Sequence, residues 1–365
     1  MQKFGYNQLS ALSSQLSARI VSHNNTNILL TSAGRRSYLV KYFQEALNGS
    51  GQVHAANSSP LSPAMQAADK SVITPIIYSN EYIPFLLDYC KANNISLVIP
   101  LFDIDLPVLA ANREKFHAAG VTLLVSDENF VRTCNDKWSA YNFLKANGFT
   151  TAPCYITLDE AENALASGEI HYPVIIKPRW GMGSLAIYRA ENLDELRVLY
   201  RKSREKIQSS YLKYESAADL QHSVLIQKII DGQEYGADIF HDFHGNHRGI
   251  VIRKKLAMRS GETDCAETVD EPSIHAALMK LSALTGHVGN LDVDVFLSGD
   301  DVYILEMNPR FGGGYPFSHA AGVNFPLAIV KWLRGEEPDS AILCAKTGVV
   351  AQKDISILKL DTVRS

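Results

Sequence analysis

At 365 residues, the chain is long enough for two or three structural units, each with its own hydrophobic core. Hydrophobic residues make up 46% and charged residues 20%, as in ordinary soluble proteins, and the net charge of −4 lacks the cationic excess of a general nucleic-acid surface. Five scattered cysteines without a C-x-x-C pair exclude a zinc knuckle, and no apolar run is long enough for a membrane span. We therefore expect a cytoplasmic protein with small-molecule partners, contacting neither membrane nor nucleic acid.

Residues 1–25 form an N-terminal extension rich in Ser, Asn and Gln. Within it, Leu9, Leu12, Leu16 and Ile20 recur at helical spacing. This pattern predicts a helix that packs against the body of the protein or against another subunit, so a homo-oligomer is left open.

Residues 26–128 alternate short apolar strands with helices. Strands are expected at residues 27–31, 52–56, 71–74, 97–100 and 122–125, with helices ending near 47 and spanning 82–93 and 106–118. A βαβ succession of this kind predicts a parallel, doubly wound sheet. A nicotinamide-binding fold is not indicated, because Ser32–Arg36 does not follow the G-x-G-x-x-G pattern and the second strand ends in Asn57 instead of an acid.

Charged residues follow two strands of this predicted sheet. Arg35 and Arg36 come after the first strand, and Asp103 and Asp105 come after the fourth. Open α/β sheets bind ligands at the carboxyl ends of their strands, so these residues are candidates for holding part of an acceptor substrate. The alternative is that the two acids cap the helix that begins near Leu106.

The pattern changes to α+β after residue 128, and we place a domain boundary near residues 126–135. Helices are expected at 137–147, 157–168, 193–209, 273–285 and 316–332, the second of them opened by the capping box Thr157–Glu160. Strands are expected at 172–177, 185–189, 223–230, 233–243 and 247–257. The resulting domain covers residues 129–340, and a tail with two strand-like pieces, V-V-A-Q and I-S-I-L-K-L, covers 341–365.

An acidic hairpin is the most informative motif of the chain. Two strands, 291–297 and 302–307, flank turn residues, and a three-residue loop would place Asp294 opposite Glu306 and Asp292 opposite Asn308. Carboxylate and amide oxygens suit Mg²⁺ on a polyphosphate, and Arg310 just beyond would neutralise phosphate charge. The alternative is an edge hairpin whose acids face water.

A second candidate phosphate-binding segment begins at Lys177. This lysine ends an apolar strand, and Gly181, Gly183 and Ser184 follow it, so backbone N–H groups can approach phosphate oxygens. The alternative is an ordinary hairpin turn with a surface lysine. Downstream, backbone groups of Lys228–Ile230 can read an adenine edge, and Glu234 can accept from ribose hydroxyls.

Substrate contacts are expected from the basic strand near Arg253, with Arg259 in the following segment. The alternative is a solvated basic hairpin. Gly312, Gly313 and Gly314 could cradle an anion before the last helix. His241, His244 and His247 flank a predicted turn, which makes a metal site there the weaker interpretation.

The joint order of Lys137, Lys177 with its Gly turn, Q-K-I-I-D-G-Q-E-Y, Asp294 and E-M-N-P-R resembles the ATP-grasp superfamily. The resemblance covers about residues 27–335 and is closest to ligases similar to the carbamoyl-phosphate-synthetase large subunit. It implies a parallel α/β pre-ATP-grasp domain at 26–128, followed by a two-subdomain ATP-grasp fold at 129–340 whose lid covers about 155–225.

The resemblance also implies roles for individual residues. Lys137 and Lys177 would contact ATP phosphates, covered by Gly181, Gly183 and Ser184. The adenine hinge would be Gln227, Lys228, Ile229 and Ile230, with Glu234 on the ribose. Asp294, Glu306 and Asn308 would hold Mg²⁺, or Mn²⁺ instead, while Arg310, Arg253 and Lys177 would act in catalysis. Two positions depart from the family pattern: Lys228 stands where Glu is usual, and Asp294 where many relatives carry Gln or Glu.

The function implied is an ATP-dependent carboxylate–amine ligase that forms an acyl phosphate and releases ADP and phosphate. Two alternatives are a carboxyphosphate or carbamate-type enzyme and a nucleotide-binding regulatory protein with an inactive site. A full carbamoyl-phosphate synthetase is not expected, because the chain has a single ATP-grasp unit.

Overall fold

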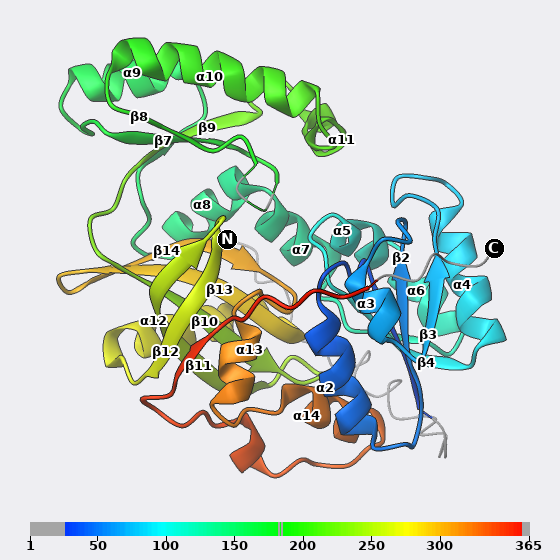
Figure 1. The fold of residues 1–365 in the computed structure, drawn as a ribbon. Helices are drawn as coiled ribbons and strands as arrows, with labels where there is room; N and C mark the ends of the chain where they lie inside the picture. The colour runs from blue at the N-terminus through cyan, green and yellow to red at the C-terminus, as the bar shows by residue number, and fades with distance from the viewer. Residues whose placement is uncertain (1–25, 182, 184, 360–365) are drawn as a thin grey trace, which may run out of the picture.

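The computed structural model describes residues 26–181, 183 and 185–359, which form three sheets (Figure 1). We call them the parallel sheet, the central sheet and the upper sheet. The helix predicted within residues 1–25 lies outside the described residues. In the part of the chain that is described, no helix is long and apolar enough to cross a membrane.

The parallel sheet has the strand order β3-β2-β1-β4-β5, with all strands parallel, which confirms the doubly wound prediction. Its strands are β1 (Asn27–Thr31), β2 (Val53–Asn57), β3 (Lys70–Ile73), β4 (Ile95–Pro100) and β5 (Thr122–Leu123). Every residue of β1 is buried, because helices cover both faces of the sheet.

Helices α2 and α3 pack on one face of the parallel sheet, and α4, α5 and α6 pack on the other. Their bounds are α2 (Ser37–Leu47), α3 (Pro63–Ala67), α4 (Tyr82–Ala92), α5 (Asp105–Ala110) and α6 (Arg113–Ala118). The single helix predicted over 106–118 is therefore wrong. The helix is interrupted at Asn112, whose side-chain amide donates a hydrogen bond to the Val108 carbonyl. Asn side chains compete in this way with backbone hydrogen bonds, so Asn is unfavourable inside a helix.

The central sheet is six-stranded, in the order β14-β13-β10-β11-β12-β15, and antiparallel throughout. Its strands are β10 (Gln233–His241), β11 (His247–Arg259), β12 (Glu262–Val269), β13 (Gly289–Ser298), β14 (Asp301–Asn308) and β15 (Val350–Gln352). Along β13, Leu291, Val293 and Val295 face a core with α8 (Lys137–Ala146) and α12 (Pro272–Thr285). The opposite face of the sheet is thereby left for polar side chains.

The upper sheet stands apart at the top of Figure 1 and has the order β6-β9-β7-β8. Its strands are β6 (Cys154–Tyr155), β7 (Val174–Pro178), β8 (Tyr188–Ala190) and β9 (Val224–Lys228). Helices α9 (Leu158–Ala166) and α10 (Leu193–Gln208) cover one face, and α11 (Leu212–Glu215) projects toward the parallel sheet (Figure 1). The capping box predicted at Thr157–Glu160 is confirmed.

The C-terminal part differs from the predicted single helix 316–332. It contains α13 (Tyr315–Ala320) and α14 (Phe325–Leu333), separated at Gly322, whose φ is +105°, and at Asn324, which caps α14. The predicted strand V-V-A-Q is confirmed as β15, which pairs with β12, whereas residues 355–359 form no strand. The domain boundaries stay predictions; helix α7 (Glu128–Asn135) lies where one of them was placed.

Candidate active site

The acidic hairpin has the predicted pairing but reaches it differently. Asp294 lies opposite Glu306, and Asp292 lies opposite Asn308. The turn has two residues between Ser298 and Asp301, not three. This register alone would shift the pairing by one residue, so that Asp294 would not lie opposite Glu306. An irregularity after Asp294 restores the pairing, because β14 carries one extra residue there, as in a β-bulge.

A basic strand faces these acids across Gly236. Gly236 pairs with Arg253 of β11 on one side and with Asp294 of β13 on the other. A Cβ at Gly236 would lie 3.4 Å from Lys255 Cε and 3.5 Å from Arg253 Nη2, so the glycine leaves room for both long side chains. Lys255 Nζ lies 2.5 Å from Glu234 Oε1 and 2.6 Å from Asp294 Oδ1. Burial lowers the pKa of Lys255, but these two carboxylates outweigh it and raise the pKa above its usual value.

Arg253 is buried, which excludes the alternative of a solvated basic strand at this position. Its guanidinium bonds to Asp238 on β10 and to Ser318 on α13, and Nη2 lies 3.7 Å from Asp292 Oδ1. A buried charge needs such partners, and here they fix the direction of the side chain.

Arg310 joins the central sheet to the parallel sheet. It lies 3.0 Å from Asp103, which follows β4, and 3.2 Å from Asp292 on β13. Burial alone would lower the pKa of Arg310, but the two carboxylates outweigh burial and raise the pKa above its usual value. The guanidinium therefore stays charged. Burial raises the pKa of Asp292 to about 7, assisted by Asp294 and opposed by Arg310.

The capping role weighed for Asp103 and Asp105 is wrong. Helix α5 begins at Asp105 without a side-chain cap. The buried Asp105 carboxylate instead accepts hydrogen bonds from Thr31, Ser32 and Tyr82 and thereby ties the start of α5 to the end of β1 and to α4. Asp103 is the partner of Arg310, as described above.

Two lysines stand on the other side of Glu306. Lys137, the first residue of α8, has its Nζ 2.9 Å from Glu306 Oε1 and 2.5 Å from the Gly181 carbonyl. Lys177 Nζ donates to Gln227 Oε1 at 2.7 Å, and burial, assisted by Lys137, lowers its pKa. Burial would raise the pKa of Glu306, but the two lysines outweigh it and hold that pKa below its usual value.

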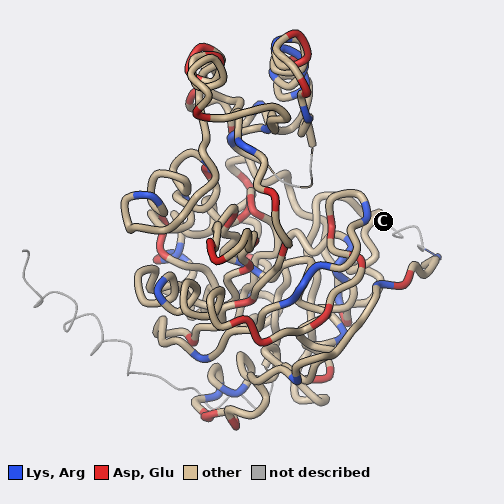
Figure 2. The backbone as a smooth tube through the Cα atoms, turned by 90° about the vertical axis from the view of Figure 1, so that its left-hand side faces the viewer, with Lys and Arg blue, Asp and Glu red and all other residues tan. Residues whose placement is uncertain are grey.

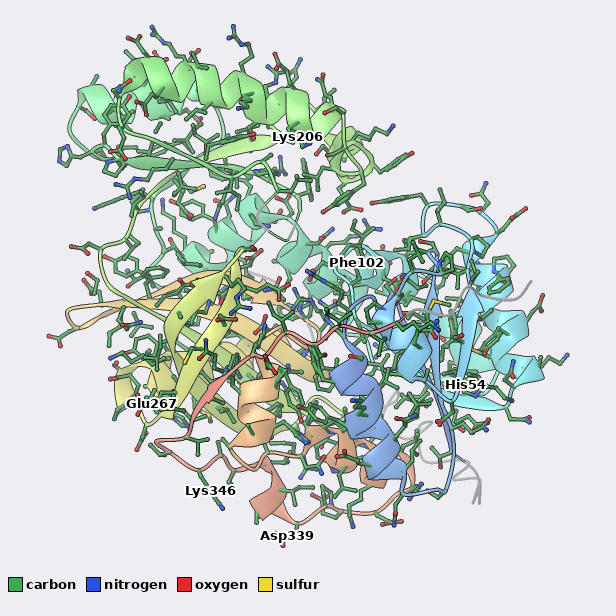
Figure 3. All side chains as sticks on the ribbon, viewed as in Figure 1. His54, Phe102, Lys206, Glu267, Asp339 and Lys346 are labelled. Carbon is green, nitrogen blue, oxygen red and sulfur yellow. The ribbon has the colours of Figure 1, made fainter. Side chains whose placement is uncertain are left out.

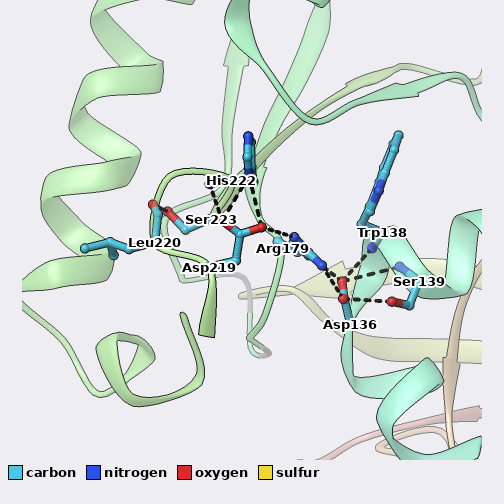
Figure 4. A network of polar contacts seen from close by, with 8 residues as sticks. All are labelled: Asp136, Trp138, Ser139, Arg179, Asp219, Leu220, His222 and Ser223. Atoms are coloured by element: carbon cyan, nitrogen blue, oxygen red, sulfur yellow. Dashed lines mark hydrogen bonds and ion pairs between the residues drawn. The ribbon is translucent and has the colours of Figure 1, made fainter. Parts of the chain in front are cut away.

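A polar network links residues that lie close to these two lysines in the sequence (Figure 4). Arg179, two residues after Lys177, forms two hydrogen bonds with Asp136, of 2.7 and 2.6 Å, and one of 3.1 Å with Asp219. Asp136 also caps α8 and immediately precedes Lys137. The bidentate pair therefore connects the upper sheet to the start of α8.

One cavity of about 760 Å³ collects most of these groups between the central and parallel sheets. Charged positions of both signs meet in the middle of the body (Figure 2), and Phe102, which follows β4 and lines the cavity, lies on its parallel-sheet side (Figure 3). The predicted site residues among its lining are Gly183, Arg253, Asp294, Glu306, Asn308, Arg310, Gly313 and Gly314. A smaller adjoining pocket is lined by Lys137, Gly181, Glu306 and Asn308. The volume of the larger cavity suits a small-molecule ligand.

Other predicted residues lie outside the cavity lining. Arg259 is half-exposed and pairs with Asp264 at 3.0 Å. Gly312 packs against Asp292, since a Cβ there would lie 2.2 Å from the carboxyl carbon. The remaining residues that do not line the cavity are Lys177, Gln227, Lys228, Ile229, Ile230 and Glu234. Ser184 lies outside the described residues.

The sequence analysis did not select several cavity residues from the parallel sheet. They are Tyr38, Asn57, Ser58, Thr74 and Phe102. All lie at or just beyond strand ends or at the start of α2, and the carboxyl-end rule for parallel sheets is the signal that could have found them. Gly236 could not be selected from the sequence, because it matters only by leaving room for the side chains of Arg253 and Lys255 on the neighbouring strand.

Two family models match the chain. The N-terminal part, residues 28–124, matches a PylC-like N-terminal domain, and residues 221–354 match a model described as ATP-grasp in the biosynthetic pathway with Ter operon. The large chain of carbamoyl phosphate synthase from Pseudomonas putida is 23% identical over 293 residues, which cover 77% of this chain. The chain spans only about a quarter of the length of that relative, 25%.

Solved structures share the fold. A biotin carboxylase from Campylobacter jejuni has a TM-score of 0.69 at 18% identity, covering 88% of this chain and 73% of its own. An L-amino acid ligase from Bacillus licheniformis has a TM-score of 0.66 at 19% identity, covering 90% and 80%. The likenesses in sequence and in fold agree: residues 221–354 match an ATP-grasp family, and the chain is similar over most of its length to part of the carbamoyl phosphate synthase large chain.

Proposed function

We propose that this chain is an ATP-dependent, ADP-forming carboxylate–amine ligase that works through an acyl phosphate. One observation carries the proposal: Asp294, Glu306 and Asn308 share a cavity with Arg253 and Arg310. Acidic and amide oxygens can bind a metal–phosphate, and the guanidinium groups can neutralise the oxygens of a transferring phosphoryl group. The fold shared with an L-amino acid ligase supports the same assignment.

ATP would lie between the upper sheet and the central sheet. Lys137 and Lys177 would contact its phosphates, and Gly181, Gly183 and Ser184 would cover them. The Lys228 N–H already donates to the Pro153 carbonyl, so adenine would be read by the Lys228 carbonyl and the Ile230 N–H. The biotin carboxylase of similar fold was solved as a complex named with beta-gamma-ATP, which supports a nucleotide at this place.

The donor set fits a hard divalent cation. Asp294, Glu306 and Asn308 offer carboxylate and amide oxygens, the ligands that Mg²⁺ prefers, with Mn²⁺ as an alternative. Lys255 and Lys137 neutralise the two acids here. When bound, the cation would supply positive charge to the phosphate oxygens.

The chemistry would proceed in two balanced steps. An oxygen of the substrate carboxylate attacks the γ-phosphorus, the bond to the β,γ-bridging oxygen breaks, and ADP leaves. The amine nitrogen then attacks the acyl carbon, phosphate leaves with the bonding pair, and the nitrogen loses a proton. Arg310 would stabilise the transferring phosphoryl group, and Arg253, fixed by Asp238, would orient the carboxylate.

The upper sheet with its helices, about residues 155–225, would act as a lid. An acyl phosphate hydrolyses readily, so water must be excluded during the reaction. Gly181 and Gly183 both have positive φ angles in the turn that faces the site, a conformation that glycine adopts without strain. The five unpaired cysteines suit the cytoplasm, where we place the protein.

The first experiment is a trapping assay. The protein is incubated with ATP, Mg²⁺, hydroxylamine and a panel of carboxylic acids, and ADP and hydroxamate are measured together. We expect ADP and hydroxamate in parallel for at least one acid, and none from Glu306→Ala, while Asp300→Ala in the turn of the same hairpin stays active. Normal turnover by the Glu306 variant would contradict the metal assignment.

A carboxyphosphate-forming enzyme is the second candidate, favoured by the likeness to carbamoyl phosphate synthase and biotin carboxylase. It predicts ADP release that bicarbonate stimulates without any hydroxamate from the acid panel. ADP release without a response to bicarbonate or to any acid would contradict both candidates.

A further inference from the structure

The cavity has an arm that the reaction described above does not use. Toward the parallel sheet it is lined by Arg36 and Tyr38 around the start of α2, by Asn57 and Ser58 at the end of β2, and by Thr74 just after β3. These walls are polar, and they lie across the cavity from the hairpin of β11 and β12, which contributes Met258 and Glu262. A substrate bound at Arg310 can therefore extend into this arm.

Most cations that line the cavity already have a carboxylate partner. Arg310 pairs with Asp103, Arg253 with Asp238, and Lys255 with Asp294. Arg35 and Lys353 share Glu262, at 3.6 and 3.4 Å. Among the described residues that line this cavity, Arg36 is the cation whose side chain makes neither a hydrogen bond nor an ion pair.

The arm therefore carries an excess of positive charge. Arg35 and Lys353 share the single carboxylate of Glu262, and Arg36 adds a third positive charge to the lining. Arg36 is only partly exposed, so water compensates its charge less well than at the surface.

Tyr38 links this excess charge to the reaction centre. Tyr38, Arg36 and Arg310 line the same cavity. Burial raises the pKa of the Tyr38 hydroxyl, and Arg36 and Arg310 oppose that rise while Glu262 adds to it. One ligand that contacts Arg310 can then reach the Tyr38 hydroxyl and Arg36. A guanidinium binds a carboxylate or phosphate through two parallel hydrogen bonds.

We infer that the substrate of this enzyme carries an anionic group, a carboxylate or a phosphate, separate from the carboxyl that is activated, and that Arg36 binds this group. The inference rests on the proposed ligase function, since it places the activated carboxyl at Arg310. It names a substrate class: acids with a second anion at the end remote from the reacting carboxyl.

Arg35 provides a matched control for Arg36. The two residues are adjacent, but the Arg35 side chain is 86% exposed and already paired with Glu262. Changing Arg35 removes the same formal charge from the same loop without removing the unpaired guanidinium. A difference between Arg36→Gln and Arg35→Gln therefore separates specific binding from a general loss of charge.

Binding is tested first, by isothermal titration of the full chain saturated with Mg²⁺ and a non-hydrolysable ATP analogue. The probes are succinate, inorganic phosphate and, as the acid without a second anion, butanoate. We expect Arg36→Gln to weaken succinate and phosphate binding about tenfold and butanoate little, whereas Arg35→Gln changes each less than about twofold. Equal losses in the two variants, unchanged binding in Arg36→Gln, or no binding of either anion to the wild type would overturn the inference.

Turnover is tested with the hydroxamate assay on matched acids, succinate against butanoate and 3-phosphoglycerate against glycerate. The wild type should prefer the acid with the second anion, and Arg36→Gln should lose that preference through KM with kcat little changed. A preference for 3-phosphoglycerate over glycerate would identify the second anion as a phosphate, and a preference for succinate over butanoate would identify it as a carboxylate. Equal use of both members of each pair would overturn the inference and leave the ligase standing. Anion binding that depends on Arg36 without any hydroxamate would instead contradict the ligase and keep the anion site.

Discussion

At the scale of single residues, Gly314 packs closely against the Arg253 side chain. A Cβ at this position would lie 2.7 Å from Arg253 Nη2 and 3.1 Å from its Cζ. Arg253 is held by Asp238 and Ser318, so its guanidinium has nowhere to move without breaking a buried ion pair.

We therefore predict that Gly314→Ala lowers kcat/KM at least tenfold and destabilises the fold by about 1–3 kcal/mol, the usual range for overpacking. Gly313→Ala is the matched control, because the nearest atom to its added Cβ is Lys353 Nζ at 3.8 Å. Kinetics and urea unfolding of both variants measure the two effects. Equal behaviour of the two alanine variants would show that Arg253 is not positioned by this contact.

Some contacts between single residues could be predicted from the sequence, and others could not. A three-residue loop between β13 and β14 was predicted to place Asp294 opposite Glu306; the pairing is confirmed, but the loop is shorter and a bulge restores the register. The bulge that produces this pairing could not be predicted, because no glycine or proline marks it. The ion pair of Asp103 with Arg310 spans 207 positions and leaves no local pattern at all.

At the scale of elements, a buried histidine cluster joins β10, β11 and α12. His241 Nε2 and His247 Nδ1 both lie within hydrogen-bond distance of Ser282 Oγ on α12, and the His241 ring stands 5.5 Å from that of His287. His287 Nδ1 in turn bonds to Ser126 Oγ before α7. Burial lowers the pKa of His241 to about 4 and that of His287 to about 3, from an ordinary value of 6.5.

These depressed values predict acid sensitivity. The unfolded chain binds protons at these histidines below pH 6.5 while the folded chain does not, so the stability they confer is complete above pH 6.5 and falls as the pH drops toward 4. We predict that the free energy of unfolding falls by about 1–3 kcal/mol from pH 6.5 to 5.

Urea unfolding at several pH values between 5 and 7.5 measures this slope. His287→Asn should make the slope shallower whatever its effect on absolute stability, and His117→Asn, on the surface helix α6, should leave it unchanged. A slope of the same size in His287→Asn would show that other groups cause the acid loss.

Elements were predictable where the pattern is local. The capping box of α9 and the strands of the parallel sheet follow from nearby residues, and both are confirmed. The strand β12 was not predicted, because its alternating polar sequence, E-T-D-C-A-E-T-V, has few strongly apolar residues. It becomes a strand by pairing with β11 and β15, which is a tertiary effect.

At the scale of the whole molecule, the upper sheet meets the parallel sheet through α11. Tyr78, in the loop after β3, stacks on Tyr214 with ring centroids 4.6 Å apart, and its hydroxyl donates to Glu215 Oε1 at 2.8 Å. Asn135, at the end of α7, donates to the other carboxylate oxygen at 2.7 Å. Neither tyrosine is fully buried, so the contact can separate without exposing a core.

We predict that this contact holds the proposed lid in its closed position. Tyr78→Ala should speed amide hydrogen exchange in residues 211–218 and raise the KM for ATP about threefold to tenfold, because closure would lose a stacked pair worth about 1 kcal/mol. Tyr78→Phe keeps the stack and loses only the hydrogen bond, so its effect should be intermediate. Exchange in α2, remote from this contact, should not change in either variant. Unchanged exchange at 211–218 in Tyr78→Ala would mean that other contacts, such as the Arg179–Asp136 pair at the start of α8, set the position of the upper sheet.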